Sequence, residues 1–194
     1  MKKLVKRSEK TGGWPLQILE MNSQSYPNLL SKRLGKDAPV RLWAIGLLDL
    51  LDMHKTTFFC SNRCPGDAIL EAMDQAQKWR DKGRCIISGF HSPIEKECLK
   101  ILLRGRQPII ICPARSLENM RIPKEWHEGI GAGRILLLSP FDPSHRRLTA
   151  ALSEQRNKLV AALADEVYVA HTTPRGKIAR LTAQISEWDI PVIK

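Results

Sequence analysis

Short apolar segments alternate with amphipathic segments along most of the chain. From about residue 56 onward, runs rich in Ile, Leu, Val and Phe are each followed by a stretch whose apolar side chains recur at helical spacing. This alternation is typical of an α/β fold in which helices cover both faces of a mainly parallel sheet. The predicted strands span residues 56–60, 84–88, 107–112, 134–139 and 166–171, and the run IPVI at 190–193 completes the alternation. The predicted helices span residues 67–82, 92–105, 123–130, 148–164 and 176–187.

The strongest local signal lies at the start of the second predicted helix. Ser92, Pro93 and Glu95 have the spacing of a capping box, in which the serine and glutamate side chains each accept a hydrogen bond from the other residue's backbone N–H. The run at 107–112 is almost continuously apolar, which indicates a strand covered on both faces. Both signals support the predicted alternation.

The first 50 residues differ from the rest, and we expect them to form a basic N-terminal segment with a small helical lead-in. Within residues 26–50, Leu29, Leu30 and Leu34 begin an apolar-periodic stretch that predicts helix. The basic residues between Lys2 and Lys10 are expected to form an unstructured arm. Residues 51–194 then form the α/β core domain.

The composition favours an anionic partner. Lys and Arg number 31 against 20 Asp and Glu, a formal net charge of +11, which is typical of nucleic-acid-binding proteins but also found in proteins that are merely basic. No apolar run approaches the roughly 18 residues of a membrane span, and no secretion signal follows the basic start, so we expect a cytoplasmic protein without membrane contact. Five cysteines argue against a disulfide framework. Cys60 and Cys64 lack the spacing of a zinc knuckle, so no metal and no cofactor is expected.

Candidate binding residues follow the predicted strands. Ligands of open parallel sheets bind at the carboxyl ends of the strands, where a helix N-terminus offers backbone N–H groups to an anion. Arg63 and Arg115 would add charge-assisted bonds to phosphate. Each candidate also has a plainer interpretation, since a loop arginine can be solvated, Ser92 can serve only the capping box, and a loop histidine can be structural. The candidates at these strand ends are Ser61, Arg63, Ser88, Gly89, His91, Ser92 and Arg115.

An ordered set of motifs resembles the DprA/Smf family of DNA-processing proteins. YPNLL at 26–30 is similar to the family's Y-P-x-x-L, and LWAIGLLDLL at 42–51 to its L-Y-x-x-G-x-x-x-L-L. Ser61-Asn62-Arg63 resembles G-S-R at the end of the first strand, and Ser88-Gly89 resembles the S-G that follows the second. GRILLLSPF at 133–141 and QRNKLVAALA at 155–164 resemble the later family motifs in the same order.

The resemblance implies a Rossmann-like, doubly wound fold that binds single-stranded DNA, or another phosphate-rich nucleotide ligand, without turnover. It also implies a role in DNA uptake and recombination, with a recombinase and a second copy of the chain as candidate protein partners. Family residues carried over to the pocket are Arg63, Ser88, Gly89, Arg156 and Asn157, with Lys158 replacing the second arginine of R-N-R. Phe90, Phe141 or Trp126 could stack on bases. We expect Arg63→Ala and Arg156→Ala to weaken binding with little loss of stability.

An enzymatic alternative remains open. The wider superfamily contains nucleotide-sensing domains and LOG-type nucleotide phosphoribohydrolases, whose P-G-G-x-G-T-x-x-E motif supplies a catalytic glutamate. The corresponding segment here, TTPRGKIAR at 172–180, has no carboxylate, although Glu95 could substitute for it. The sequence therefore favours non-catalytic binding over hydrolysis.

Overall fold

The structure is a computed structural model in which residues 6–7, 11–118 and 120–193 are described. Its strands are β1 (Lys6–Arg7), β2 (Pro15–Glu20), β3 (Arg41–Ile45), β4 (Lys55–Cys60), β5 (Cys85–Ser88), β6 (Ile109–Ile111), β7 (Ile135–Ser139), β8 (Glu166–His171) and β9 (Val192–Ile193). Its helices are α1 (Asn28–Leu34), α2 (Gly66–Asp81), α3 (Pro93–Leu103), α4 (Lys124–Gly131), α5 (Ala150–Leu163) and α6 (Lys177–Ser186), with 3-10 turns η2 (Gly35–Asp37) and η3 (Leu48–Asp52).

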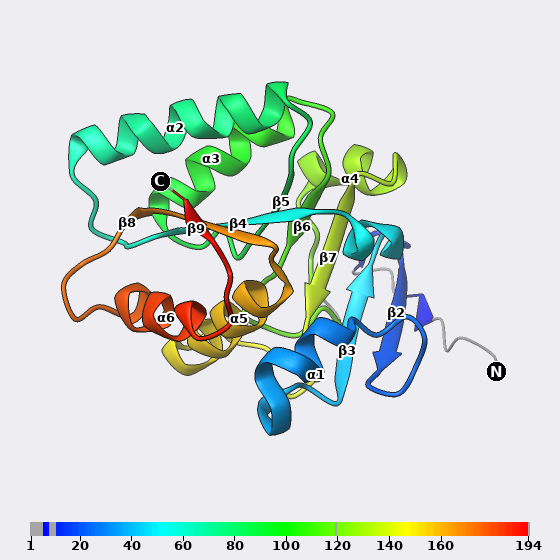
Figure 1. Cartoon of the computed structure of the whole chain (residues 1–194). Helices are drawn as coiled ribbons and strands as arrows, with labels where there is room; N and C mark the ends of the chain where they lie inside the picture. The colour runs from blue at the N-terminus through cyan, green and yellow to red at the C-terminus, as the bar shows by residue number, and fades with distance from the viewer. Residues whose placement is uncertain (1–5, 8–10, 119, 194) are drawn as a thin grey trace.

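The strands form one mixed sheet in the order β1-β2-β3-β7-β6-β5-β4-β8-β9. The six strands from β7 to β9 are parallel, and β1, β2 and β3 extend the sheet with antiparallel pairings. From β4 the chain winds in one direction through β5 and β6 to β7, then returns through α5 to β8 on the other side of β4 (Figure 1). The predicted Rossmann-like, doubly wound α/β fold is therefore confirmed.

The sheet separates two hydrophobic cores, because successive side chains of a strand point to opposite faces. In β4, Phe58 packs into the core beneath α2, α3 and α4, whereas Phe59 packs into the core beneath α1, α5 and α6 (Figure 1). Both rings are almost completely buried. Because both faces of these strands are covered, their sequences are nearly continuous hydrophobic runs, and this is why the pattern alone located them.

The predicted helical lead-in is wrong for residues 41–45, which form strand β3. Leu42 and Ala44 enter one core while Trp43 and Ile45 enter the other, a period of two that is hidden because both sets are apolar. β3 pairs with β7 in an antiparallel register, with Trp43 opposite Ser139. The helical expectation holds only for the segments before and after it, α1, η2 and η3.

The predicted basic arm lies mostly outside the described residues. Within it, Lys6 and Arg7 form the short strand β1, which pairs with β2, so this part of the arm is not unstructured as expected. The other residues of the arm, 2–5 and 8–10, are not among those described. Strand β2 itself had no counterpart among the predicted elements.

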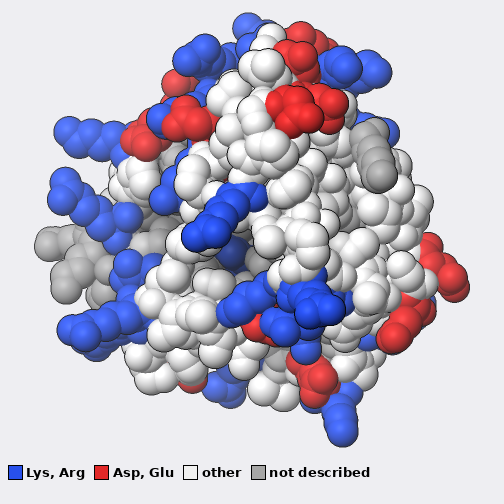
Figure 2. All heavy atoms as spheres, turned by 90° about the vertical axis from the view of Figure 1, so that its left-hand side faces the viewer, with Lys and Arg blue, Asp and Glu red and all other residues white. Residues whose placement is uncertain are grey.

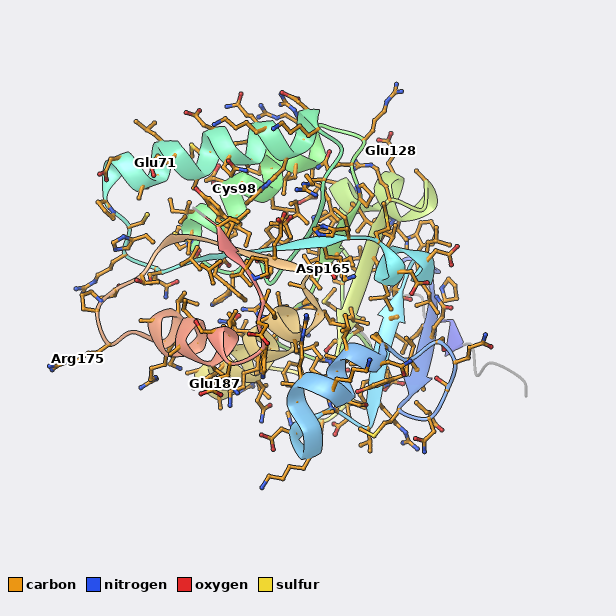
Figure 3. All side chains as sticks on the ribbon, viewed as in Figure 1. Glu71, Cys98, Glu128, Asp165, Arg175 and Glu187 are labelled. Atoms are coloured by element: carbon orange, nitrogen blue, oxygen red, sulfur yellow. The ribbon has the colours of Figure 1, made fainter. Side chains whose placement is uncertain are left out.

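A buried lysine fixes the start of the central strand. Lys55 is 3% exposed, and its Nζ donates to the carbonyls of Leu51 and Met53 at 3.0 and 2.6 Å. The Oδ2 atom of Asp165, which precedes β8 and is labelled in Figure 3, lies 3.4 Å from this Nζ and accepts the Lys55 backbone N–H at 2.7 Å. The pair thereby joins the first residue of β4 to the residue before β8, at the edge opposite to the carboxyl ends of these strands.

The cysteines are all free thiols, and Cys85 and Cys112, which lie within apolar runs of the sequence, are buried in the core. Burial raises the pKa of Cys85, Cys98 and Cys112 to about 12, so these thiols remain protonated at neutral pH. Within the described residues, no three His, Cys, Asp or Glu side chains are placed to share a metal ion. In the same part of the chain, no helix is both long and apolar enough to cross a membrane.

Candidate nucleic-acid interface

A cleft of about 470 Å³ opens at the carboxyl ends of β4, β5 and β8. It lies beside the point where the chain reverses its direction of winding, between β4 and β8, which is where doubly wound sheets bind ligands. The N-terminal turns of α5 and α6 complete its walls. Figure 2 looks onto this side of the molecule and shows Lys and Arg side chains gathered around a hollow.

The structure brings most of the predicted site residues to this cleft. Those that line it are Ser61, Arg63, His91, Ser92, Arg156 and Asn157. Ser88, Gly89, Arg115 and Lys158 do not: Gly89 lies beneath Arg156, and Lys158 lines a neighbouring hollow. Lys177, Thr173 and Gly176 also line the cleft although they were not among the predicted residues. All three lie in or directly after the loop that follows β8, one of the strand-end loops in which ligand-binding residues are expected.

Glu95 anchors the start of α3. The predicted capping box is confirmed, with the Ser92 hydroxyl accepting from the Glu95 N–H at 3.2 Å. The Glu95 carboxylate accepts the backbone N–H groups of His91 and Ser92 at 2.7 and 3.1 Å through Oε2, and that of Cys60 at 3.0 Å through Oε1. One buried carboxylate therefore fastens the end of β4 to the loop that follows β5.

This arrangement changes what the α3 N-terminus can bind. We expected the backbone N–H groups of residues 88–92 to be offered to an anion, but those of His91 and Ser92 already donate to Glu95. The Glu95 side chain takes the place that a phosphate takes at other helix N-termini. An anion in the cleft must therefore be held mainly by side chains.

Arg156 is the buried cation of the cleft. It is 2% exposed, and its guanidinium donates to the Cys112 carbonyl and to Asn157 Oδ1, each at 2.8 Å. Burial lowers the pKa of Arg156, and the nearby Glu95 carboxylate opposes this shift. An arginine stays protonated in proteins, so the positive charge persists at the base of the cleft. The expectation that Arg156→Ala would leave stability unchanged is not compatible with this degree of burial and bonding.

Gly89 provides the space that this guanidinium occupies. A Cβ atom at residue 89 would lie 1.6 Å from Arg156 Nη1. Since the guanidinium is held by the Cys112 carbonyl, it can yield only by losing that bond.

We predict that Gly89→Ala lowers the free energy of unfolding by about 1–3 kcal/mol and displaces Arg156. Urea unfolding measures the first effect. Gly66→Ala is the control, because a Cβ atom there meets no other atom within 4 Å. An unfolding free energy equal to that of the wild type would show that Arg156 does not need the space.

Ser88 stabilises the strand ends and does not face the cleft. Its hydroxyl is fully buried, donates to the Phe58 carbonyl at 2.7 Å and accepts the Phe90 N–H at 3.3 Å. Ser139, at the end of β7, repeats this arrangement with the Arg115 carbonyl and the Phe141 N–H. Phe90 and Phe141 are themselves buried, so neither ring is available to stack on a base, contrary to the expectation from the sequence.

The remaining lining groups suit binding better than nucleophilic catalysis. Arg63 is exposed, and its side chain has no hydrogen-bond or ion-pair partner among the described residues. Burial, Arg156 and Lys96 lower the pKa of His91, so the imidazole is neutral at pH 7. Burial raises the pKa of the Cys60 thiol far above its usual range, which keeps it protonated. Glu95 is the only carboxylate among the described lining residues, and it is occupied by three backbone N–H groups.

Comparison with known proteins agrees with this fold. The X-ray structure of DNA processing protein A (DprA) from Streptococcus pneumoniae superimposes with a TM-score of 0.74 at 23% identity, over 95% of this chain and 63% of that one. DNA processing protein A from Helicobacter pylori, described for its single-stranded DNA binding mode, gives 0.69 at 20% identity, over 91% of this chain and 79% of that one. This chain thus spans less than two thirds of the pneumococcal protein, and no curated protein matches it.

The sequence itself matches a family over most of its length. The match extends over residues 17–185, from β2 to the last turn of α6, and includes every strand and loop that builds the cleft. The motifs that suggested the DprA/Smf family lie within this range. The chain therefore belongs to the family described as DNA recombination-mediator protein A.

Proposed function

We propose that the protein binds single-stranded DNA by its phosphodiester backbone in the cleft at the ends of β4, β5 and β8. The observation that carries the proposal is the clustering of Arg63, Arg156 and Lys177 around this one cleft. Arginine forks and lysine ammonium groups are the usual partners of phosphate oxygens. The family description, and the single-stranded DNA bound by the Helicobacter relative, support the same ligand.

Arg63 is the one of these three cations that is both exposed and without a hydrogen-bond or ion-pair partner among the described residues. Its exposed side chain is free to form a bidentate bond with a phosphate, whereas the Arg156 guanidinium already donates to the Cys112 carbonyl and to Asn157. Arg156 then contributes mainly a fixed positive potential beneath the bound strand. Removal of the Arg63 side chain should therefore weaken DNA binding without lowering the stability of the protein.

The test is a titration with oligo-dT and with thymidine monophosphate at several salt concentrations. Contact with about four to six phosphates predicts a log–log salt slope of roughly −3 to −4 for a single strand. Arg63→Ala is expected to weaken oligo-dT binding about tenfold or more, with an unchanged melting temperature. Arg104→Ala is the control, because Arg104 is an exposed cation at the far end of α3.

A free nucleotide, sensed or hydrolysed, is the competing ligand. Tight binding of thymidine monophosphate with a flat salt slope would overturn the DNA proposal. Hydrolysis is disfavoured by the bonding of Glu95, since a general acid or base must be able to reach the substrate proton.

The protein partners follow from the family rather than from the cleft. A recombination mediator must present its strand to another protein, so we include a recombinase as a partner of the DNA-bound form. A second copy of the chain is the other proposed partner. Light scattering of the free protein, and co-sedimentation of a recombinase with the protein on oligo-dT, test the two partners separately.

A further inference from the structure

A second, smaller hollow adjoins the cleft. It has a volume of about 180 Å³ and lies between α5 and α6. We call it the α5–α6 groove; the residues that line it are Glu154, Asn157, Lys158, Lys177, Arg180, Leu181 and Gln184. Asn157 and Lys177 line the cleft as well, so the two hollows meet along these side chains.

The α5–α6 groove carries an excess of positive charge. Lys158, Lys177 and Arg180 line it, and Glu154 is the only acidic residue among the described residues of its lining. Glu154 is 3.4 Å from Lys177, whose Nζ also donates to the Ala150 carbonyl at 3.3 Å. The side chains of Lys158 and Arg180 have neither an ion pair nor a hydrogen bond with any described residue. Two cations of the groove are therefore left for a ligand.

The cations of the two hollows lie on one continuous surface. The lower half of Figure 2, where α6 lies in Figure 1, shows basic side chains next to the central hollow. Lys177 is the first residue of α6 and stands between the cleft and the groove. A mononucleotide held in the cleft has no second phosphate to place in the groove, whereas a polynucleotide has one at every nucleotide.

We propose that the α5–α6 groove is a second phosphate subsite, which extends the binding path of a single strand beyond the cleft and makes the protein select polymers over free nucleotides. The inference rests on the proposed function, because it takes the cleft as the first subsite. Lys158 and Arg180 contact the phosphates that follow the nucleotide in the cleft. Lys177 spans the junction, where its bond to Glu154 keeps it near both hollows.

The test compares thymidine monophosphate with a longer oligo-dT on a pair of double variants. Lys158→Ala/Arg180→Ala removes the two unpartnered cations of the groove. Lys78→Ala/Arg104→Ala is the matched control; it removes the same charge from exposed positions near the C-terminal ends of α2 and α3. Lys78, Arg104 and Arg180 are exposed, and Lys158 is half-buried but has no hydrogen bond or ion pair with a described residue, so both variants should keep a melting temperature close to that of the wild type.

We expect the groove variant to bind long oligo-dT about tenfold more weakly, and its salt slope to be smaller in magnitude by about 1.4, the value for two lost phosphate contacts on a single strand. Binding of thymidine monophosphate should not change, because a single nucleotide occupies the cleft and has no second phosphate for the groove. The control variant should retain the wild-type slope.

Different results would overturn the groove proposal and the cleft proposal. A wild-type salt slope and affinity in the groove variant, together with normal binding by the wild-type protein, would overturn the groove and leave the cleft intact. Equal losses in the groove and control variants would also overturn it, because general charge would then explain the effect. Absence of oligo-dT binding by the wild-type protein would overturn both.

Discussion

Glu95→Ala is expected to lower the free energy of unfolding by about 3–5 kcal/mol, the largest loss that we predict for one residue. The substitution leaves the N–H groups of Cys60, His91 and Ser92 without their acceptor. It also removes the carboxylate that compensates the buried charge of Arg156. The end of β4 and the start of α3 would then lose their shared anchor, and the cleft would lose its shape.

Urea unfolding of three variants makes the test specific. Glu95→Gln keeps one acceptor oxygen but loses the charge, so it should fall between the wild type and Glu95→Ala. Glu97 lies on the same helix and pairs with Lys100 at the surface, so Glu97→Ala should cost no more than about 0.5 kcal/mol. Equal stability of the Glu95→Ala and Glu97→Ala variants would contradict the anchoring role.

Asp165→Ala is expected to cost about 3 kcal/mol, because it leaves the buried Lys55 ammonium without its counterion. The same change deprives the Lys55 backbone N–H of its acceptor. We place the cost at the lower end of the range for broken buried pairs, because Asp165 is about one third exposed and two carbonyls still hold the Lys55 Nζ.

A double-mutant cycle separates the charge effect from the lost hydrogen bond. In a Lys55→Met background no buried charge remains, so Asp165→Ala should cost at least about 1 kcal/mol less than it does in the wild type. Asp165→Asn, which keeps an oxygen for the Lys55 N–H, should be milder than Asp165→Ala. Strictly additive effects of the two substitutions would show that the ion pair contributes nothing.

The central part of the fold was predictable because its strands are buried on both faces. The apolar runs at 84–88 and 134–139 have almost the bounds of β5 and β7. The same burial misled the interpretation of residues 41–45, where apolar side chains on both faces of β3 hide the strand period. The antiparallel pairing of β3 with β7 joins segments far apart in sequence, and no local pattern reports it.

The site was predictable in location but not in detail. The rule that ligands bind at the carboxyl ends of strands led to Arg63, and the family resemblance led to Arg156; the structure brings both to one cleft. The hydrogen bond from the Cys60 N–H to Glu95 joins the end of β4 to α3, and no spacing of residues in the sequence predicts it. Likewise, an arginine in a helical segment looks solvent-exposed in the sequence, and only the fold shows that Gly89 makes room for its guanidinium.

The pairing of β3 with β7 also determines when, during synthesis, the N-terminal strands can join the sheet. Residues 15–45 form the antiparallel side of the sheet, yet the strand that attaches them ends only at Ser139. During synthesis from the N-terminus, β2 and β3 therefore emerge long before their place in the sheet exists. Strand β4 is made earliest among the parallel strands, and its pairing is complete only when β8 has been synthesised, more than 100 residues later. Such distant pairings slow folding.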